Sequence, residues 1–316
     1  MNIIFSAKIT APHRDKLKQL FTDETFVFCD NMGAAEEHLA TAEVLVTYGE
    51  DLTDVMIENA KNLKWIMVIS AGLDQMPFTA ISKRDILVTN ARGIHKIPMA
   101  EYAISHILQV SKQTKQLLEN QKNQKWDRTV RAQEITGKTM LVVGAGAIGQ
   151  EVARLAKAFR MQTYGVSRSG GELEFFDKSV RPHEMETLLP EVDFIISVLP
   201  NTPETKGFFT KEHFESLPNH AVFLNMGRGS AVSGEVILEA IQSKEIAHAI
   251  LDVFEKEPLP AEHPLWLEEN ITITPHLSGL TPNYQIRALE IFEQNLHTYR
   301  QNGTNFINRI DITRGY

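Results

Sequence analysis

Short apolar runs alternate with amphipathic, polar-rich stretches along the first part of the chain. The runs are rich in β-branched residues and occupy positions 2–7, 26–30, 42–48, 63–70 and 86–90. Near-continuous apolar runs separated by helical stretches are typical of parallel strands buried on both faces of a sheet. The pattern therefore predicts one α/β layer structure in this part of the chain.

A second alternating series follows. A helical stretch is predicted to start at Pro98, and Thr281 with Pro282 resembles the N-cap and first turn of a C-terminal helix. Between them, strands are predicted at residues 139–143, 162–167, 192–200, 221–227, 246–253 and 271–276. The simplest fold class is α/β, with two doubly wound parallel-sheet domains. Periodicity leaves open which domain the last helix covers.

The composition narrows the class of protein. With 32 Lys and Arg against 40 Asp and Glu, the net charge is −8. We therefore expect neither nucleic acid nor an anionic membrane as the main partner, because both favour a basic surface. No apolar run has the roughly 20 residues of a membrane-spanning helix, and the N-terminus lacks the basic start of a signal peptide. The lone Cys29 cannot form an internal disulfide, so we expect a cytoplasmic protein. We assign no metal ligands.

The stretch TMLVVGAGAIGQEVARLAKAF, residues 139–159, contains a glycine run. Gly144, Gly146 and Gly149 follow an apolar strand and open an amphipathic helix, which is the context that the dinucleotide fingerprint requires. There the first glycine permits a tight turn, the second admits a pyrophosphate, and the third lets helix and strand pack closely. We therefore predict a dinucleotide site whose first helical turn includes Ala147 and Ile148.

The end of the next strand bears on the choice of dinucleotide. NAD-selective sites place an acidic residue there to hold the ribose 2′-hydroxyl. This chain has Ser167, Arg168 and Ser169 instead, and no carboxylate until Glu172. A guanidinium flanked by hydroxyls suits a 2′-phosphate, which a carboxylate would repel. We therefore expect NADP (as NADPH) to be preferred, with NAD still possible.

Three later segments place polar side chains just after apolar strands. They are FLNMGRGS with Arg228, LDVFEKEP with Glu257, and ITPHLSG with His276. Because ligands of open α/β sheets gather beyond the carboxyl ends of strands, the three would meet at one edge. Together they suit reduction of a 2-keto acid. His276 would donate a proton, Glu257 would orient and charge the imidazole, and Arg228 would grip the carboxylate and polarise the carbonyl.

In several of these motifs the chain resembles the D-isomer-specific 2-hydroxyacid dehydrogenases. The matching stretches are VGAGAIGQEVARLAKAF, SVLPNTPETKGFF, FLNMGRGSAV, LDVFEKEPLP with HPLW, and TPHLSG, and SAGLDQ is similar to the family's substrate loop. The resemblance implies a flavodoxin-like substrate domain, residues 1–97 plus 284–316, and a Rossmann cofactor domain, residues 98–283. It further implies an active-site cleft between the two domains and a homodimer built through the cofactor domain, with the helix after Pro98 and the arm around Trp126 at the interface.

The resemblance also implies roles for individual residues. It assigns Arg228, Glu257 and His276 as the catalytic trio, and backbone amides near Ala71 and Gly72 to the substrate carboxylate. It implies that Asp252 meets the nicotinamide amide, and that Leu199 and Pro200 line the cofactor cleft.

Our main hypothesis is an NADPH-dependent reductase of a small anionic 2-keto acid such as glyoxylate or hydroxypyruvate, resembling the NADPH-dependent reductases of those two acids within the family. One alternative is an NAD-linked hydroxyacid dehydrogenase of a biosynthetic pathway. The other is a dinucleotide-sensing binding module without enzyme activity.

Overall fold

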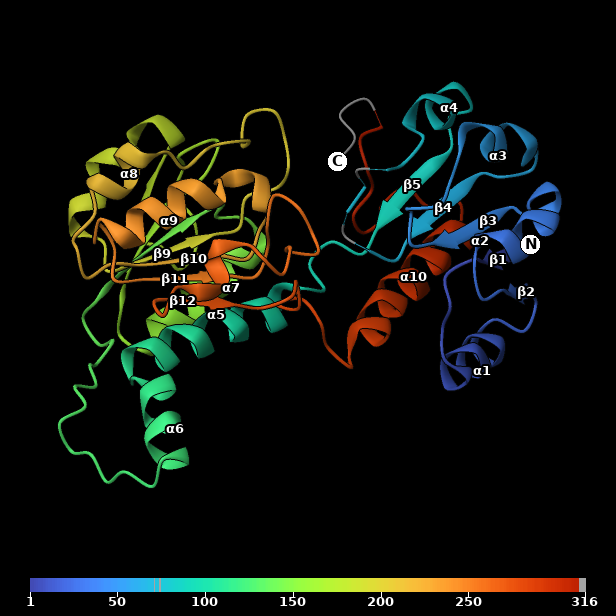
Figure 1. The fold of residues 1–316 in the computed structure, drawn as a ribbon. Coiled ribbons are helices and arrows are strands. Elements are labelled where there is room, and N and C mark those ends of the chain that lie inside the picture. The colour runs from blue at the N-terminus through green and yellow to red at the C-terminus, as the bar shows by residue number, and fades with distance from the viewer. Residues whose placement is uncertain (71, 74, 313–316) are drawn as a thin grey trace. The chain divides into compact units, whose positions relative to one another are not determined.

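A computed structural model describes residues 1–70, 72–73 and 75–312 (Figure 1). The chain forms two compact units, and each is described by itself. The first unit comprises Met1–Ile94 and Thr281–Tyr316, and the second comprises His95–Leu280. Both divisions lie three residues before the boundaries expected from the sequence. Among the described helices, none is long and apolar enough to span a membrane.

The first unit is built on a sheet of five parallel strands. These are β1 (Asn2–Phe5), β2 (Thr25–Phe28), β3 (Val44–Thr47), β4 (Trp65–Val68) and β5 (Leu87–Asn90), one in each predicted run. They lie in the order β2-β1-β3-β4-β5, which is the doubly wound flavodoxin-like order. The α/β fold predicted for this part is therefore confirmed.

Helices cover both faces of this sheet because successive strand side chains point to opposite faces. On one face Ile4, Leu45 and Ile66 form a core with α2 (Met32–Ala35), α3 (Asp54–Asn59) and α4 (Phe78–Lys83). On the other, Phe5 and Trp65 pack with α1 (Ala11–Leu20) and α10 (Tyr284–Arg300). The C-terminal helix therefore belongs to the first unit.

The start of α10 differs from the prediction. The helix begins at Tyr284, with Asn283 as the N-cap residue, rather than at Pro282 after Thr281. The Thr281 hydroxyl accepts a hydrogen bond from the Asn283 backbone N–H, and the Thr281 carbonyl accepts one from Tyr284. Thr281 therefore forms a turn that precedes the helix.

The second unit is built on a sheet of seven parallel strands. They are β6 (Thr139–Val143), β7 (Gln162–Val166), β8 (Lys178–Val180), β9 (Phe194–Ser197), β10 (Val222–Asn225), β11 (His248–Leu251) and β12 (Ile271–Ile273). Their order is β12-β11-β10-β9-β6-β7-β8. The first strand, β6, lies inside the sheet, and the strand order runs outward from it first to one side and then to the other, as in the Rossmann fold. Six strands coincide with predicted runs. The prediction missed β8, because three residues reading Lys-Ser-Val carry too weak an apolar signal.

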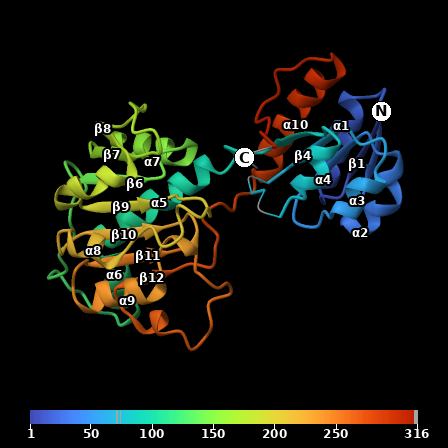
Figure 2. The same ribbon diagram turned by 90° about the horizontal axis from the view of Figure 1, so that it is seen from above.

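Helices again cover both faces (Figure 2). Residues of α5 (Lys96–Ser111) and α7 (Ala147–Ala158) share one core with β6, while α8 (Lys211–Glu215) and α9 (Gly234–Gln242) join the core on the other face. The stretch predicted to start at Pro98 begins at Lys96 instead, since proline is tolerated in a first turn. It breaks at Gln113, whose φ is 56°, and continues as α6 (Thr114–Lys122).

Candidate active site

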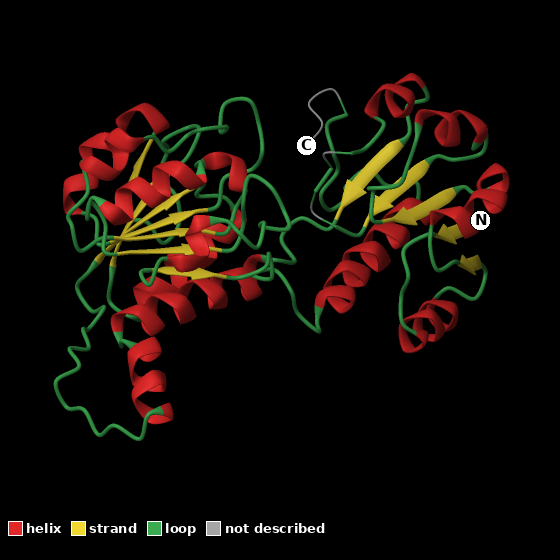
Figure 3. Cartoon of the chain, in the orientation of Figure 1, coloured by secondary structure: helices red, strands yellow, loops and turns green. Residues whose placement is uncertain are grey.

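All strands of the second sheet run in the same direction, so their carboxyl ends form a single edge (Figure 3). Along that edge β12, β11 and β10 are neighbours, followed by β9, β6 and β7. His276 follows β12, Glu257 follows β11 and Arg228 follows β10. The glycine run follows β6, and Arg168 follows β7. The predicted trio and the predicted dinucleotide turn therefore share one sheet edge.

Close backbone contacts require a glycine at two of the three positions of the run. Gly144 has φ of 99°, and a β-carbon there would lie 2.7 Å from the Val198 carbonyl oxygen. A β-carbon on Gly149 would lie 2.6 Å from the Gly144 carbonyl oxygen. In contrast, Gly146 is exposed at the N-cap of α7 with open space around its Cα.

The open position fits a pyrophosphate. Gly146 leaves room for close approach, and the first-turn N–H groups of Ala147 and Ile148 have no partner within a helix. These groups and the helix dipole attract an anion. The residues present therefore fit a dinucleotide, with the phosphates at the start of α7.

The segment after β7 forms a tight turn. The Ser167 hydroxyl accepts a hydrogen bond from Gly170 N–H at 3.1 Å, and Gly170 has φ of 66°. Arg168 and Ser169, between them, are exposed. The turn follows β7, which neighbours β6, the strand that leads into the glycine run and α7.

A buried asparagine shapes the Arg228 turn. Asn225, fully buried at the end of β10, accepts from Gly227 N–H at 3.2 Å and donates to the Arg228 carbonyl oxygen at 3.1 Å. The Arg228 Nη1 donates to the Gly227 carbonyl oxygen at 2.9 Å. The next residue, Gly229, packs so tightly that a β-carbon would overlap the Phe254 backbone. The Arg228 turn is therefore locked against the segment that carries Glu257.

Glu257 and His276 form a direct pair. His276 Nδ1 lies 2.7 Å from Glu257 Oε2, and the other carboxylate oxygen, Oε1, accepts from Phe254 N–H at 3.0 Å. The His276 side chain is 52% exposed and that of Glu257 34% exposed. Because the carboxylate engages Nδ1, the ring's Nε2 is the nitrogen left to reach a substrate.

A buried carboxylate holds the His276 loop. Asp252 is 0% exposed, and its Oδ1 accepts from the Thr274 hydroxyl at 2.6 Å and from Leu277 N–H at 2.9 Å. Its Oδ2 accepts from Ser278 N–H at 3.0 Å. His276 itself has φ of 52°, and its N–H donates to the Asp252 carbonyl oxygen. Asp252 thus fastens both sides of His276, whose left-handed backbone conformation is uncommon among residues other than glycine.

A chain of hydroxyls extends this anchor to α5. The Thr274 hydroxyl donates to Asp252, so it accepts from the Tyr102 hydroxyl, 2.7 Å away. Burial raises the pKa of Tyr102, which keeps it a donor. Asn225, Thr274 and Tyr102 were not predicted from the sequence. An asparagine closing the apolar run VFLN was a signal for the first, but nothing in the helical pattern singled out Tyr102.

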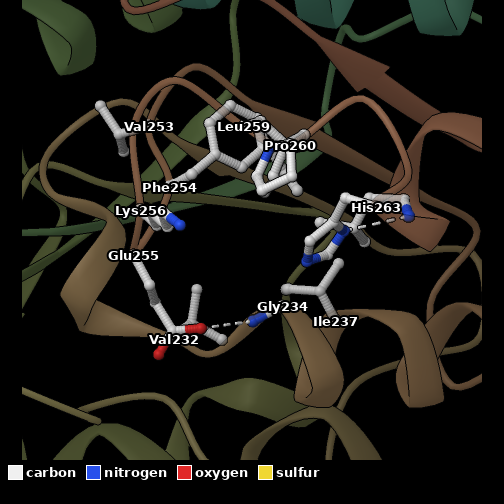
Figure 4. A pocket seen from close by; sticks show the side chains of 12 residues that line it. Val232, Gly234, Ile237, Val253, Phe254, Glu255, Lys256, Leu259, Pro260 and His263 are labelled. Atoms are coloured by element: carbon white, nitrogen blue, oxygen red, sulfur yellow. Dashed lines mark hydrogen bonds between the residues drawn. The ribbon is translucent and has the colours of Figure 1, made fainter.

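A cavity of about 180 Å³ is lined in part by residues 253–256, which precede Glu257 in the chain (Figure 4). Apolar side chains line it, among them Val232, Ile237 and Leu259. At its rim Glu255 Oε2 accepts from Gly234 N–H at 3.0 Å, at the start of α9. A carboxylate is favourable at a helix N-terminus, so this bond ties the Glu257 segment to the body of the second unit.

The remaining predicted residues lie in different surroundings. Leu199 is buried between the Gly144 and Gly227 turns, and Pro200 after it is exposed. Gly72 lies beyond the end of β4 in the first unit, where its carbonyl oxygen accepts from the Ser70 hydroxyl. Ala71 lies outside the described residues.

Known proteins are similar to this chain in sequence and in fold. Glyoxylate/hydroxypyruvate reductase B of Escherichia fergusonii is 32% identical over 251 residues, which cover 78% of this chain and 77% of that protein. D-3-phosphoglycerate dehydrogenase of Archaeoglobus fulgidus is 32% identical over 80% of this chain, but the chain spans only about half (49%) of that protein's length.

A solved structure and a family model agree with these relatives. The crystal structure of a D-isomer specific 2-hydroxyacid dehydrogenase family protein from Aeromonas salmonicida matches with a TM-score of 0.87 and 33% identity, covering 98% of this chain and 99% of the other. The model of the D-isomer specific 2-hydroxyacid dehydrogenase NAD-binding domain matches residues 104–278. The chain therefore belongs to the D-isomer specific 2-hydroxyacid dehydrogenases, a family of NAD(P)-dependent oxidoreductases.

Proposed function

We propose that this protein reduces a small anionic 2-keto acid to the D-2-hydroxy acid, with NADPH as the hydride source. The observation that carries the proposal is the Glu257–His276 pair, 2.7 Å apart, on the same sheet edge as Arg228 and the glycine turn. A dinucleotide whose phosphates sit at the start of α7 would extend along this edge in both directions. Its nicotinamide would lie toward β10–β12 and its adenosine toward β7.

In the proposed mechanism the bound nicotinamide supplies the hydride for the keto carbon. His276 donates a proton from Nε2 to the developing alkoxide. Glu257 fixes the imidazole ring and stabilises its charged form. Arg228 binds the substrate carboxylate and polarises the carbonyl, acting on charge that grows toward the transition state. Asp252 holds the turn that aims His276, and its contact with the nicotinamide amide stays a prediction.

The first unit contains a further segment predicted to bind substrate. We propose that backbone amides near Ala71 and Gly72 bind the substrate carboxylate. We also propose that Leu199 and Pro200 of the second unit contact the cofactor. This part of the proposal rests on the family resemblance.

A second candidate is an NAD-linked hydroxyacid dehydrogenase, which the similarity to D-3-phosphoglycerate dehydrogenase favours. One experiment separates the readings. The purified protein is mixed with NADPH or NADH and a panel of keto acids, and the absorbance of the reduced nicotinamide is followed. We expect turnover of a small keto acid with NADPH. Turnover only with NADH would favour the second candidate. Cofactor binding without turnover of any acid would favour a sensing module.

We expect Arg168→Asp to weaken NADPH binding about 100-fold, because it removes a charge-assisted contact to the 2′-phosphate and adds repulsion. NADH affinity should change less than threefold. Nicotinamide fluorescence titration measures both dissociation constants. Arg160→Asp, which precedes β7 at the opposite sheet edge, makes the same charge change and is the control. Equal losses for both cofactors would refute a 2′-phosphate role.

We also propose a homodimer formed through α6 and the segment that follows it. Trp126 is 92% exposed there, with Leu118 at 61% and Leu117 at 44%. Large apolar side chains exposed in one short segment are available for contact with a second copy of the chain.

We therefore expect Trp126→Ser to weaken the dimer at least tenfold, since buried aromatic anchors dominate interfaces. Light scattering after size exclusion, over a dilution series, measures the dissociation. Val55→Ser, at a 63% exposed residue of the first unit, is the control. A wild-type chain that is monomeric at micromolar concentration would contradict the proposal.

A further inference from the structure

Arg181 comes directly after β8, the edge strand that the sequence analysis missed. Strand β8 pairs with β7 in parallel, with Val166 opposite Val180, and Ser167 N–H donates to the Val180 carbonyl oxygen. Arg181 therefore lies at the same sheet edge as the Ser167–Gly170 turn, beside Arg168 and Ser169.

The turn and the arginine are fitted to each other. A β-carbon on Gly170 would lie 2.7 Å from Arg181 Cγ and 3.0 Å from its backbone nitrogen. Only a glycine therefore lets the Arg181 side chain lie against the turn. The Arg181 Nε then donates to the Ser169 carbonyl oxygen at 3.3 Å. This contact engages one side of the guanidinium and leaves its two terminal nitrogens for another acceptor.

Arg168 alone would neutralise only part of the charge of a 2′-phosphate. The pKa of Glu204 is lowered by hydrogen bonds from its own backbone N–H and the Thr202 hydroxyl and, to a smaller extent, by the Arg168 charge. Part of the Arg168 charge is thus compensated before any ligand binds. A phosphate monoester carries nearly two negative charges at neutral pH, so a second cation would be needed.

We propose that Arg181 is a second 2′-phosphate-binding residue, which closes the subsite formed by Arg168 and the Ser169 hydroxyl and thereby helps to set the preference for NADPH over NADH. This inference rests on the NADPH use proposed above. The Glu184 carboxylate accepts from the Arg181 backbone N–H at 2.8 Å, and the ion pairs found among the described residues do not include the Arg181 guanidinium. The planar guanidinium suits paired hydrogen bonds to phosphate oxygens.

The test measures binding without any keto acid, so it is independent of the proposed catalysis. Wild type, Arg181→Ala, Arg181→Lys and the control Lys178→Ala, at the other end of β8, are titrated with NADPH, NADH and 2′,5′-ADP. We expect Arg181→Ala to weaken NADPH and 2′,5′-ADP at least tenfold and NADH less than twofold. Arg181→Lys should retain part of the affinity, and Lys178→Ala should behave as wild type.

Two outcomes would overturn the inference in distinguishable ways. In the first, wild type prefers NADPH and Arg181→Ala keeps that preference, whether its affinity for both cofactors falls equally or stays unchanged. Arg181 then has at most a structural role, and the proposed function stands. If wild type binds NADPH and NADH equally, the Arg181 subsite and the cofactor part of the proposed function fail together. Unfolding midpoints of all four proteins verify that each is folded.

Discussion

We expect His276→Ala to lower kcat for keto-acid reduction by about 100- to 10,000-fold while changing KM and cofactor affinity little. A positioned general acid contributes about this factor, and its effect belongs to the transition state. In the structure His276 is half exposed and held by Glu257 and by the loop that Asp252 anchors. Steady-state kinetics with saturating NADPH measure the change.

The control is His183→Ala, which removes an exposed histidine elsewhere in the second unit. It should leave kcat unchanged. If His276→Ala keeps wild-type turnover, the proton donor is a different group. If instead KM rises with kcat unchanged, His276 contributes to substrate binding and not to proton transfer.

We expect Gly229→Ala to reduce kcat/KM at least about 100-fold, even though Gly229 contacts no reacting atom. Its β-carbon would overlap the Phe254 backbone, so the segment 254–257 or the Arg228 turn must shift. Either shift separates Arg228 from the Glu257–His276 pair, and misplacement by about 1 Å costs about this factor. The same kinetic assay measures it.

Gly33→Ala makes the same chemical change on a short helix of the first unit, where the new β-carbon would meet only the Asn31 side chain. It should be silent. The unfolding midpoint and the affinity for NADPH, measured on the Gly229→Ala protein, distinguish a local shift from loss of the fold. Wild-type kcat/KM in a folded Gly229→Ala protein would show that the contact with Phe254 does not position the site.

The sequence indicated the fold well because parallel buried strands are near-continuous apolar runs, and eleven such runs became strands. The exception, β8, is short and polar and pairs only at the sheet edge. Helix starts were less predictable. Pro98 and Thr281 are start signals, but α5 begins at Lys96 and α10 at Tyr284, since turns that precede a helix use the same residue types.

The candidate site was predictable to the extent that its residues follow strands. Arg228, Glu257 and His276 could be assigned to one sheet edge because parallel strands end together. The supporting residues could not. The Tyr102–Thr274 hydrogen bond and the close approach of Arg181 to Gly170 are contacts between different elements of the fold. The pattern of apolar and polar residues along the chain does not reveal such contacts.

The most direct test of the central claim is a crystal structure of the protein with NADPH and oxamate, an unreactive isostere of a 2-keto acid. Our account predicts that the oxamate carboxylate binds Arg228 and that its amide carbonyl oxygen lies within hydrogen-bond distance of His276 Nε2. Its amide carbon, which corresponds to the keto carbon, should lie against the nicotinamide ring. Oxamate bound away from these three groups, or a nicotinamide directed away from His276, would contradict it.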